Sequence, residues 1–261
     1  MKALSTAATG MLAQQTNVDV IANNIANANT PGFKAGRAQF ADLIYQTQGR
    51  EGSITSEGGT MTPVALDIGL GVRSTGVIRH HEQGGLISTG NDLDMAIDGK
   101  GYFIINRPDG TVAYSRAGNF SLSPEGEIVT LDGYQVDPGI VVPEGARDIQ
   151  ISPTGFVSAY VGNAVEPQNL GQITLATFIN EAGLKTIGDN LLLETTSSGQ
   201  AVIGAPGEEG FGIVRQRYVE GSNVDSVKQI TDLIVAQRTY EMNSKSLVAA
   251  DEMMKTAGQI R

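Results

Sequence analysis

Apolar side chains near the start of the chain recur every seven residues. They are Leu4, Met11, Val18 and Ile25, and three positions after each of them come Ala7, Gln14, Ile21 and Ala28. This is the spacing of the a and d positions on one face of a helix that packs against another helix. The run Asn29-Thr30-Pro31-Gly32 ends the pattern, because a proline disfavours helical geometry at the residue before it. We therefore predict one long N-terminal helix.

The same period returns at the other end of the chain. The positions are Leu233, Tyr240, Leu247 and Met254, followed three residues later by Ala236, Asn243, Ala250 and Ala257. Asp225, or the Ser222-Asn223 pair before it, is the expected cap of this second helix. Each helix alone also fits an amphipathic helix that packs on its own domain. Two terminal helices with one shared period favour pairing with each other as a coiled-coil-like layer.

Between these helices, short β-prone runs alternate with turn sequences. Pro108-Asp109-Gly110, Pro124-Glu125-Gly126 and Asp132-Gly133 are turns of the kind that join hairpin strands. The predicted strands are Leu93–Ile97, Tyr102–Asn106, Thr111–Arg116, Asn119–Ser123, Glu127–Leu131, Tyr134–Val136, Ile149–Ile151, Phe156–Tyr160 and Gln172–Ile179. The predicted fold class is α+β, with a glycine-rich all-β domain between the two terminal helices.

Composition separates the same three parts of the chain. The 261 residues carry a net charge of −10, of which residues 1–45 contribute +1 and residues 225–261 contribute nothing, so the middle holds −11. The middle also holds 29 of the 33 glycines. An acidic chain without a basic stripe is not expected to bind nucleic acid, and no apolar run approaches the roughly 18 residues of a membrane span. The first twenty residues lack the apolar core of a secretory signal, so we expect export, if any, without a cleaved signal peptide.

No arrangement of side chains points to catalysis. The chain has no cysteine, and its two histidines, His80 and His81, are adjacent, so on a strand they point to opposite faces and do not chelate one metal. Ala96 and Ile97 stand where a calcium loop needs an oxygen ligand and a glycine, which leaves the aspartates Asp92, Asp94 and Asp98 as strand-edge or turn residues. We predict no catalytic residue, no metal and no cofactor.

Both ends of the chain resemble one protein family. Asn23–Lys34, which reads NNIANANTPGFK, resembles the N-terminal signature of bacterial flagellar rod and hook proteins. Gly221–Met253, which reads GSNVDSVKQITDLIVAQRTYEMNSKSLVAADEM, resembles their C-terminal signature, and Asp92–Val136 resembles their β domain. The length and the stretch LDIGLGVR at Leu66–Arg73 are similar to the distal-rod members of that family. These resemblances cover nearly the whole chain.

The resemblance implies a mechanical function. A distal-rod subunit polymerises axially into a rigid drive shaft that carries motor torque to the hook. Its expected partners are other copies of itself, proximal-rod proteins, the hook protein, the surrounding basal-body bushing rings and the flagellar type III export apparatus. Its expected location is the basal-body rod that spans the periplasm.

The resemblance also implies a division of labour along the chain. Residues 1–30 and 222–261 are the expected inner assembly domain, residues 31–72 a linker region with a rod-type β-hairpin insertion at 46–63, and residues 73–221 the outer β domain. Taken from composition alone, residues 46–63 are either a flexible linker or a structured insertion. The expected assembly interface is Leu4, Met11, Val18, Asn23, Asn24, Ile25, Asn27, Pro31, Gly32, Phe33, Leu233, Arg238, Tyr240, Glu241, Leu247 and Met254.

Two alternatives stay open from the sequence. The first is another rod or hook subunit of the same family, from which the insertion at 46–63 would discriminate. The second is a secreted β-rich adhesin or lectin, which would need an aromatic or calcium-bound groove. Locally, Arg238 and Glu241 are three residues apart and are expected to form an ion pair on the second helix.

Overall fold

The computed structural model describes residues 2–49, 66–162 and 166–259. The chain forms two compact units. The first comprises Met1–Ala26, Gly36–Ile78 and Asp225–Arg261, and the second comprises Asn27–Ala35 and Arg79–Val224. Each unit is therefore built from pieces that are far apart in the sequence.

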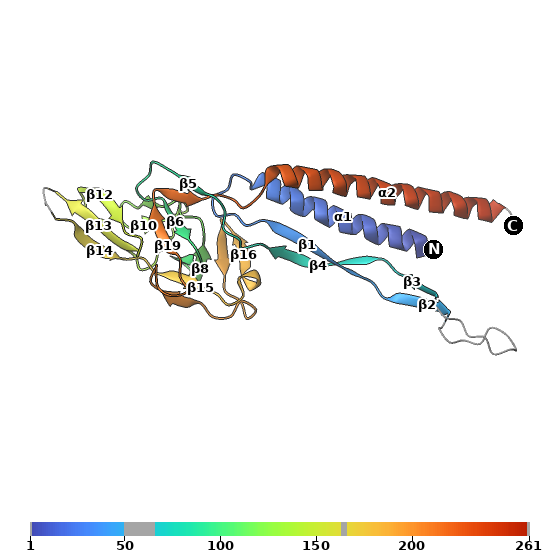
Figure 1. The fold of residues 1–261 in the computed structure, drawn as a ribbon, viewed down its shortest axis with the longest axis horizontal. Coiled ribbons are helices and arrows are strands. Elements are labelled where there is room, and N and C mark those ends of the chain that lie inside the picture. Colours follow the sequence, from blue (N-terminus) through green and yellow to red (C-terminus); the bar gives the residue numbers. More distant parts are fainter. Residues whose placement is uncertain (1, 50–65, 163–165, 260–261) are drawn as a thin grey trace. The chain divides into compact units, whose positions relative to one another are not determined.

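The first unit contains both long helices, α1 (Lys2–Ala26) and α2 (Ser226–Gln259). They lie side by side, as Figure 1 shows in blue and red. Asn24 contacts Gln229 near one end of the pair and Gly10 faces Asn243 farther along, so the helices are antiparallel. The carboxylate of Asp225 accepts hydrogen bonds from the amides of Val227 and Lys228 and caps α2. The predicted pairing of the terminal helices is confirmed.

Strands complete the first unit. They are β1 (Gly36–Asp42), β2 (Tyr45–Gly49), β3 (Leu66–Gly69) and β4 (Val72–Arg79), of which β1 pairs with β4 and β2 with β3. Helix α1 packs against β1. Of the predicted insertion at 46–63, only residues 46–49 are described, and they lie in β2. The rest of that prediction lies outside the described residues.

The second unit is the β-rich part of the chain, and its described strands are short and antiparallel. They are β5 (Leu86–Ser88), β6 (Met95–Asp98), β7 (Tyr102–Asn106), β8 (Val112–Ser115), β9 (Ser121–Leu122), β10 (Ile128–Val129), β11 (Gln135–Val136), β12 (Ala146–Ile151), β13 (Phe156–Val161), β14 (Gln168–Gln172), β15 (Leu175–Thr177), β16 (Lys185–Gly188), β17 (Leu191–Leu193), β18 (Val202–Gly204), β19 (Ile213–Gln216) and β20 (Tyr218–Glu220), with one turn of 3₁₀ helix at Glu181–Gly183.

The largest sheet of this unit runs in the order β16-β17-β8-β7-β11-β10-β9, and β15 joins it by pairing with β7 and β18. Strand β7 is buried on both faces. Phe103 and Ile105 belong to one apolar cluster, while Tyr102 and Ile104 belong to a second cluster on the other side. This explains why β7 reads as an unbroken apolar run, since alternation appears only where one face meets water.

Glycine makes the predicted turns possible. Gly126 has a φ of +83°, which side chains rarely adopt, and a Cβ there would lie 2.3 Å from the carbonyl oxygen of Val142. The amide of Gly126 closes its turn onto the carbonyl of Ser123. The turn joins β9 to β10, as the Pro124-Glu125-Gly126 sequence predicted.

Candidate functional site

The seam between α1 and α2 is lined by small side chains. Ala236 and Ala250 are 2% and 7% exposed, and Ala7 on α1 is 9% exposed. A Cβ placed on Gly10 would lie 3.0 Å from the Asn243 side-chain nitrogen, so glycine there lets the backbones approach. These are the d positions of the predicted stripe and a glycine next to it. Small residues therefore allow the two helices to pack closely, without a large apolar core between them.

Asn24 is a buried polar residue that joins three elements of the first unit. Its amide nitrogen donates to the Gly36 carbonyl at 2.8 Å and to the Gln229 side-chain oxygen at 3.0 Å. Its oxygen accepts from the Gly36 amide at 2.9 Å. One side chain thus ties α1 to β1 and to α2. Because an unpaired buried amide is costly, this node favours a single register of the helix pair.

The structure places the other predicted assembly residues of the helices at different depths. Along the seam, six of them are half-buried, namely Leu4, Met11, Val18, Ile25, Leu233 and Leu247. Four others are exposed in the single chain, namely Arg238, Tyr240, Glu241 and Met254, as is Asn23. The structure thus brings together the first set and leaves the second on the surface of α2 and α1.

The N-terminal signature passes from α1 into the second unit as a tight turn. The Thr30 amide donates to the Asn27 carbonyl, and the Phe33 amide donates to the Thr30 carbonyl. Gly32 has a φ of +70°, and a Cβ there would lie 2.5 Å from the backbone nitrogen of Ala117. Pro31 precedes it and accepts a hydrogen bond from Asn190 through its carbonyl. Any side chain at position 32 would therefore force the turn away from the loop segment that follows β8.

Two side chains fix the end of this turn. Phe33 is buried, and the Arg79 guanidinium lies over its ring at 5.6 Å from the centroid. The next residue, Lys34, is 5% exposed and points its ammonium group at Glu220. The turn is thus held by an aromatic anchor and by a buried charge.

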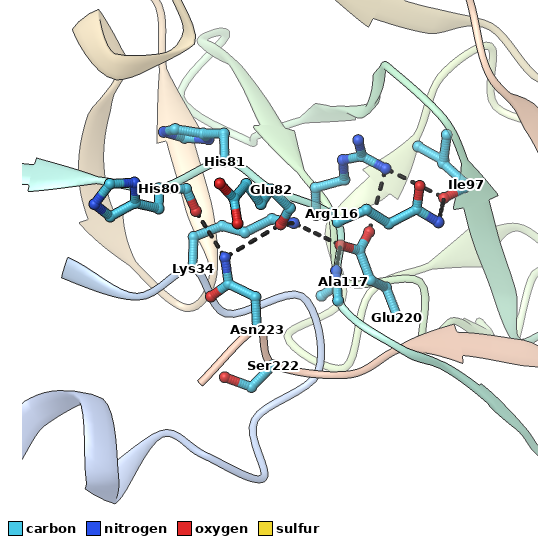
Figure 2. Close-up of polar contacts among 12 residues, drawn as sticks. Lys34, His80, His81, Glu82, Ile97, Arg116, Ala117, Glu220, Ser222 and Asn223 are labelled. Carbon is cyan, nitrogen blue, oxygen red and sulfur yellow. Dashed lines mark hydrogen bonds and ion pairs between the residues drawn. The ribbon is translucent and has the colours of Figure 1, made fainter. Parts of the chain in front are cut away.

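Glu220 is the centre of a buried ion triad, drawn in Figure 2. It is completely buried, with one oxygen 2.5 Å from Lys34 Nζ and the other 3.2 Å from Arg116 Nη1. Arg116 also donates to the carbonyls of Ile97 at 3.2 Å and Gly99 at 2.6 Å. Glu220 additionally accepts from the Gly84 amide at 2.9 Å. Two cations share one carboxylate, and hydrogen bonds to the backbone satisfy much of their remaining capacity.

Burial governs the ionisation of this region. It lowers the pKa of Lys34, and the Glu220 carboxylate opposes that shift by favouring the charged ammonium. Burial, assisted by the positive charges of Lys34 and Arg79, also lowers the pKa of His81 to about 4. The ring is therefore neutral at pH 7, and its Nδ1 lies 2.8 Å from the Tyr102 hydroxyl.

Asn223 binds two separate stretches of backbone in the second unit, one at Ala35 and one at His80 and Glu82 (Figure 2). Its side-chain oxygen accepts from the Ala35 amide at 2.7 Å. Its nitrogen donates to the His80 carbonyl at 2.8 Å and the Glu82 carbonyl at 3.2 Å. We call Lys34, Glu220 and Asn223, together with the backbone groups that they bind, the crossing clamp. Its chemistry is that of a structural joint, because each polar group is directed at another part of the chain.

Three family models match parts of the chain. Residues 4–34 match the family described as flagella basal body rod protein. Residues 96–159 match the flagellar hook protein FlgE/F/G D1 domain, and residues 215–260 match the flagellar basal body rod FlgEFG protein C-terminal family.

Comparison with whole proteins decides the assignment. The flagellar basal-body rod protein FlgG of Caulobacter vibrioides is 54% identical over 261 residues, covering 100% of both chains. The protein of the same name from Borreliella burgdorferi is 47% identical, covering 100% of this chain and 99% of its own. The flagellar hook-basal body complex protein FlhP of Bacillus subtilis is 29% identical over the whole of both chains. The chain belongs to the flagellar basal-body rod protein family.

For this rod-family chain, the residues considered for metal chemistry have other partners. Asp92 pairs with Arg217 at 2.6 Å, and Asp98 pairs with Arg215 at 2.7 Å. Asp94 accepts from the Asn91 side chain at 2.9 Å. Among the described residues, no group of three or more His, Asp or Glu side chains is arranged to hold a metal ion. Nor does any helix of the described ranges combine the length and hydrophobicity needed to cross a membrane.

The sequence reasoning missed the crossing clamp. Lys34 and Asn223 stand inside the two family signatures, which was the available signal, but neither was named as a site residue. Arg116 and Glu220 carried no local signal, since 104 residues separate them and only the fold brings them together. From the sequence alone, charged residues such as these are expected on the surface, because charged side chains are mostly exposed in proteins.

Proposed function

We propose that the chain is a structural subunit of the flagellar distal rod, polymerising axially into a rigid shaft that carries motor torque to the hook. The observation that carries this proposal is the match over the full length to flagellar basal-body rod proteins at up to 54% identity. The role is mechanical, with neither a catalytic step nor a cofactor.

The helix pair supports assembly with other copies. Small residues fill the α1–α2 seam, while α2 leaves large apolar side chains on its other sides: Val227, Ile230, Ile234, Val235, Met242, Val248 and Met253 are all exposed. A contiguous apolar surface on a soluble chain marks an interaction site. The predicted assembly residues on α2, including Tyr240 and Met254, belong to the surface that neighbouring copies would cover.

The domain division and the partners complete the proposal. Residues 1–30 and 222–261 would form the inner layer of the rod, residues 31–72 a connecting region, and residues 73–221 the outer layer. The partners would be copies of the chain, proximal-rod proteins below, the hook protein above, the bushing rings around them and the type III export apparatus. The rod would span the periplasm within the basal body.

Electron cryo-microscopy of filaments grown from the purified chain tests the proposal. We expect a tube whose lumen is lined by α1 and α2 of every copy and whose outer surface is formed by the second unit. Filaments with the β-rich unit at the lumen, or a chain that stays monomeric under all conditions that support rod growth, would overturn it.

A further inference from the structure

The chain passes between the two units four times: it enters the second unit at Asn27, leaves after Ala35, returns at Arg79 and leaves again after Val224. The last three of these crossings end at residues that the crossing clamp binds, namely Ala35, His80 and Asn223. We propose that the clamp binds these three crossings into one joint within the second unit, which opens as a single cooperative unit and bears load when the chain is pulled. The load-bearing part of this inference rests on the proposed rod function, whereas the cooperative opening does not.

The first line of support is the hydrogen bonding among the crossings. The His80 amide donates to the Ala35 carbonyl at 2.9 Å, which joins the first of these three crossings to the second. Asn223, on the third crossing, bonds to Ala35 and His80 and so holds both of the others. Lys34 also donates to the Glu82 carbonyl at 2.7 Å. No crossing is therefore held by its own stretch of chain alone.

The second line of support is the attachment of the clamp to the core. The carbonyl of Glu220 accepts from the Gly32 amide at 2.8 Å, while its carboxylate binds Lys34 and Arg116. Arg116 follows strand β8 and reaches the carbonyls of Ile97 and Gly99 at the end of β6. A force applied to any of these three crossings is thus transmitted through Glu220 and Arg116 to strands β6 and β8 of the second unit.

The third line of support is the chemistry of the bonds. Removal of Glu220 or Lys34 from the triad would expose or strand a buried charge, so these bonds break together or not at all. Hydrogen bonds bound into one network open as one local unfolding unit. Three crossings that are bound together at one place share an applied force, whereas three independent crossings would detach one after another.

Hydrogen exchange of the full chain tests cooperative opening. The informative amides are those of Gly32, His80 and Gly84, because none of them bonds to Asn223. In Asn223→Ala we expect all three to exchange at least tenfold faster and by the same factor, while amides of β7 are unchanged. Ser222→Ala is the matched control, since the Ser222 hydroxyl accepts a local hydrogen bond from the Val224 amide two residues along the chain. Unchanged exchange at Gly32 and Gly84 in Asn223→Ala would overturn the proposal.

A second variant covers the case in which Asn223→Ala fails to fold. Asn223→Asp keeps the acceptor for the Ala35 amide but loses both donated bonds, and the same joint acceleration is expected from it. Unequal acceleration that is confined to His80 would show independent crossings and would overturn the single joint.

Motility under load tests the mechanical part. In cells that depend on this chain for their rod, Asn223→Ala should assemble rods and swim normally in dilute buffer, but should lose at least half of the parental speed in viscous medium. Equal speed at high viscosity would remove the load-bearing role. A parental chain that restores no rod would instead contradict the proposed function and leave the exchange result to decide the clamp.

Discussion

The two units of the chain bury very different side chains. In the second unit large residues form the core: Met95, Phe103 and Phe120 are 0–1% exposed. In the helix pair of the first unit the buried residues are mostly alanines, with Ile21 and Asn24, while Val227 and Met253 are 75% and 65% exposed. The second unit thus has a core of large apolar side chains, whereas the helix pair leaves several of its large apolar side chains exposed.

This difference indicates which unit is stable without contacts to neighbouring copies. Burying a large apolar side chain contributes about 1.5–3 kcal/mol, and the second unit obtains this from its own core. The helices obtain little of it, and isolated helices are marginal without tertiary packing. We infer that the stability of the helix pair depends on neighbouring copies, whereas the stability of the second unit does not.

The largest effect should come from a charge in the helix seam. Leu247 is half-buried at an a position of α2. A carboxylate placed there and buried by assembly costs several kcal/mol, so Leu247→Asp should abolish polymerisation. Sedimentation should show only monomer, and the urea midpoint of the second unit should stay unchanged. Ser246→Asp, which places the same charge at an exposed neighbouring position, should still polymerise. Normal filaments from Leu247→Asp would contradict the assignment of Leu247 to the buried helix seam.

The opposite experiment damages the second unit and spares the helices. Glu220→Gln leaves Lys34 and Arg116 buried without their counter-ion, and we expect the free energy of unfolding of the second unit to fall by about 3–5 kcal/mol. Urea titration followed by tyrosine fluorescence measures it. Glu209→Gln, at an exposed acid, is the control. A loss below about 1 kcal/mol would mean that the triad contributes little.

Limited proteolysis compares the two units directly in one sample. In a dilute monomer, trypsin should remove about 30–45 residues from each end at least a hundredfold faster than it cuts within residues 79–224, because the helix pair opens locally at low cost. Mass spectrometry of the fragments reports the sites. If the ends of a proven monomer resist trypsin as well as residues 79–224 do, the predicted difference in local stability between the two units is wrong.

The smallest predicted effect is a pH dependence confined to the second unit. The pKa of His81 is lowered to about 4 in the folded chain, against about 6.5 when unfolded. Between these values the unfolded chain binds a proton that the folded chain does not, so the free energy of unfolding falls as pH drops from about 6.5 to about 4. Because the ring is only partly buried, screening limits the loss to on the order of 1–2 kcal/mol. Urea midpoints of His81→Gln should lose this slope, while His80→Gln should keep it.

The sequence was informative where structure is local. The seven-residue period identified the helix pair, and even Asn243 at its d position lies on the seam facing Gly10. Turn sequences located β7 at Tyr102–Asn106, the same bounds that the structure has. By contrast, β16 was missed because all four of its residues are exposed, so no alternation of apolar and polar residues marks it.

The remaining misses come from contacts between distant residues. Arg116 and Glu220 meet only through the fold, and the interface role expected of the a positions Tyr240 and Met254 concerns neighbouring copies that a single chain does not have. Tyr240 and Met254 are 43% and 41% exposed for that reason. The ion pair expected between Arg238 and Glu241 remains a prediction, with both side chains exposed.

The antiparallel helix pair also sets the order in which the chain can fold. Asn24 and Gln229 are 205 residues apart, and closing a flexible loop of that length costs about 3 kcal/mol more entropy than closing one of ten residues. Once the second unit has formed, the Ala35 amide nitrogen and the Asn223 side-chain oxygen already lie 2.7 Å apart. Only short stretches of chain separate Ala35 from Asn24 and Asn223 from Gln229. We therefore expect the helices to pair last, starting at Asn24, so that the first unit stays incomplete until α2 has been added to the chain.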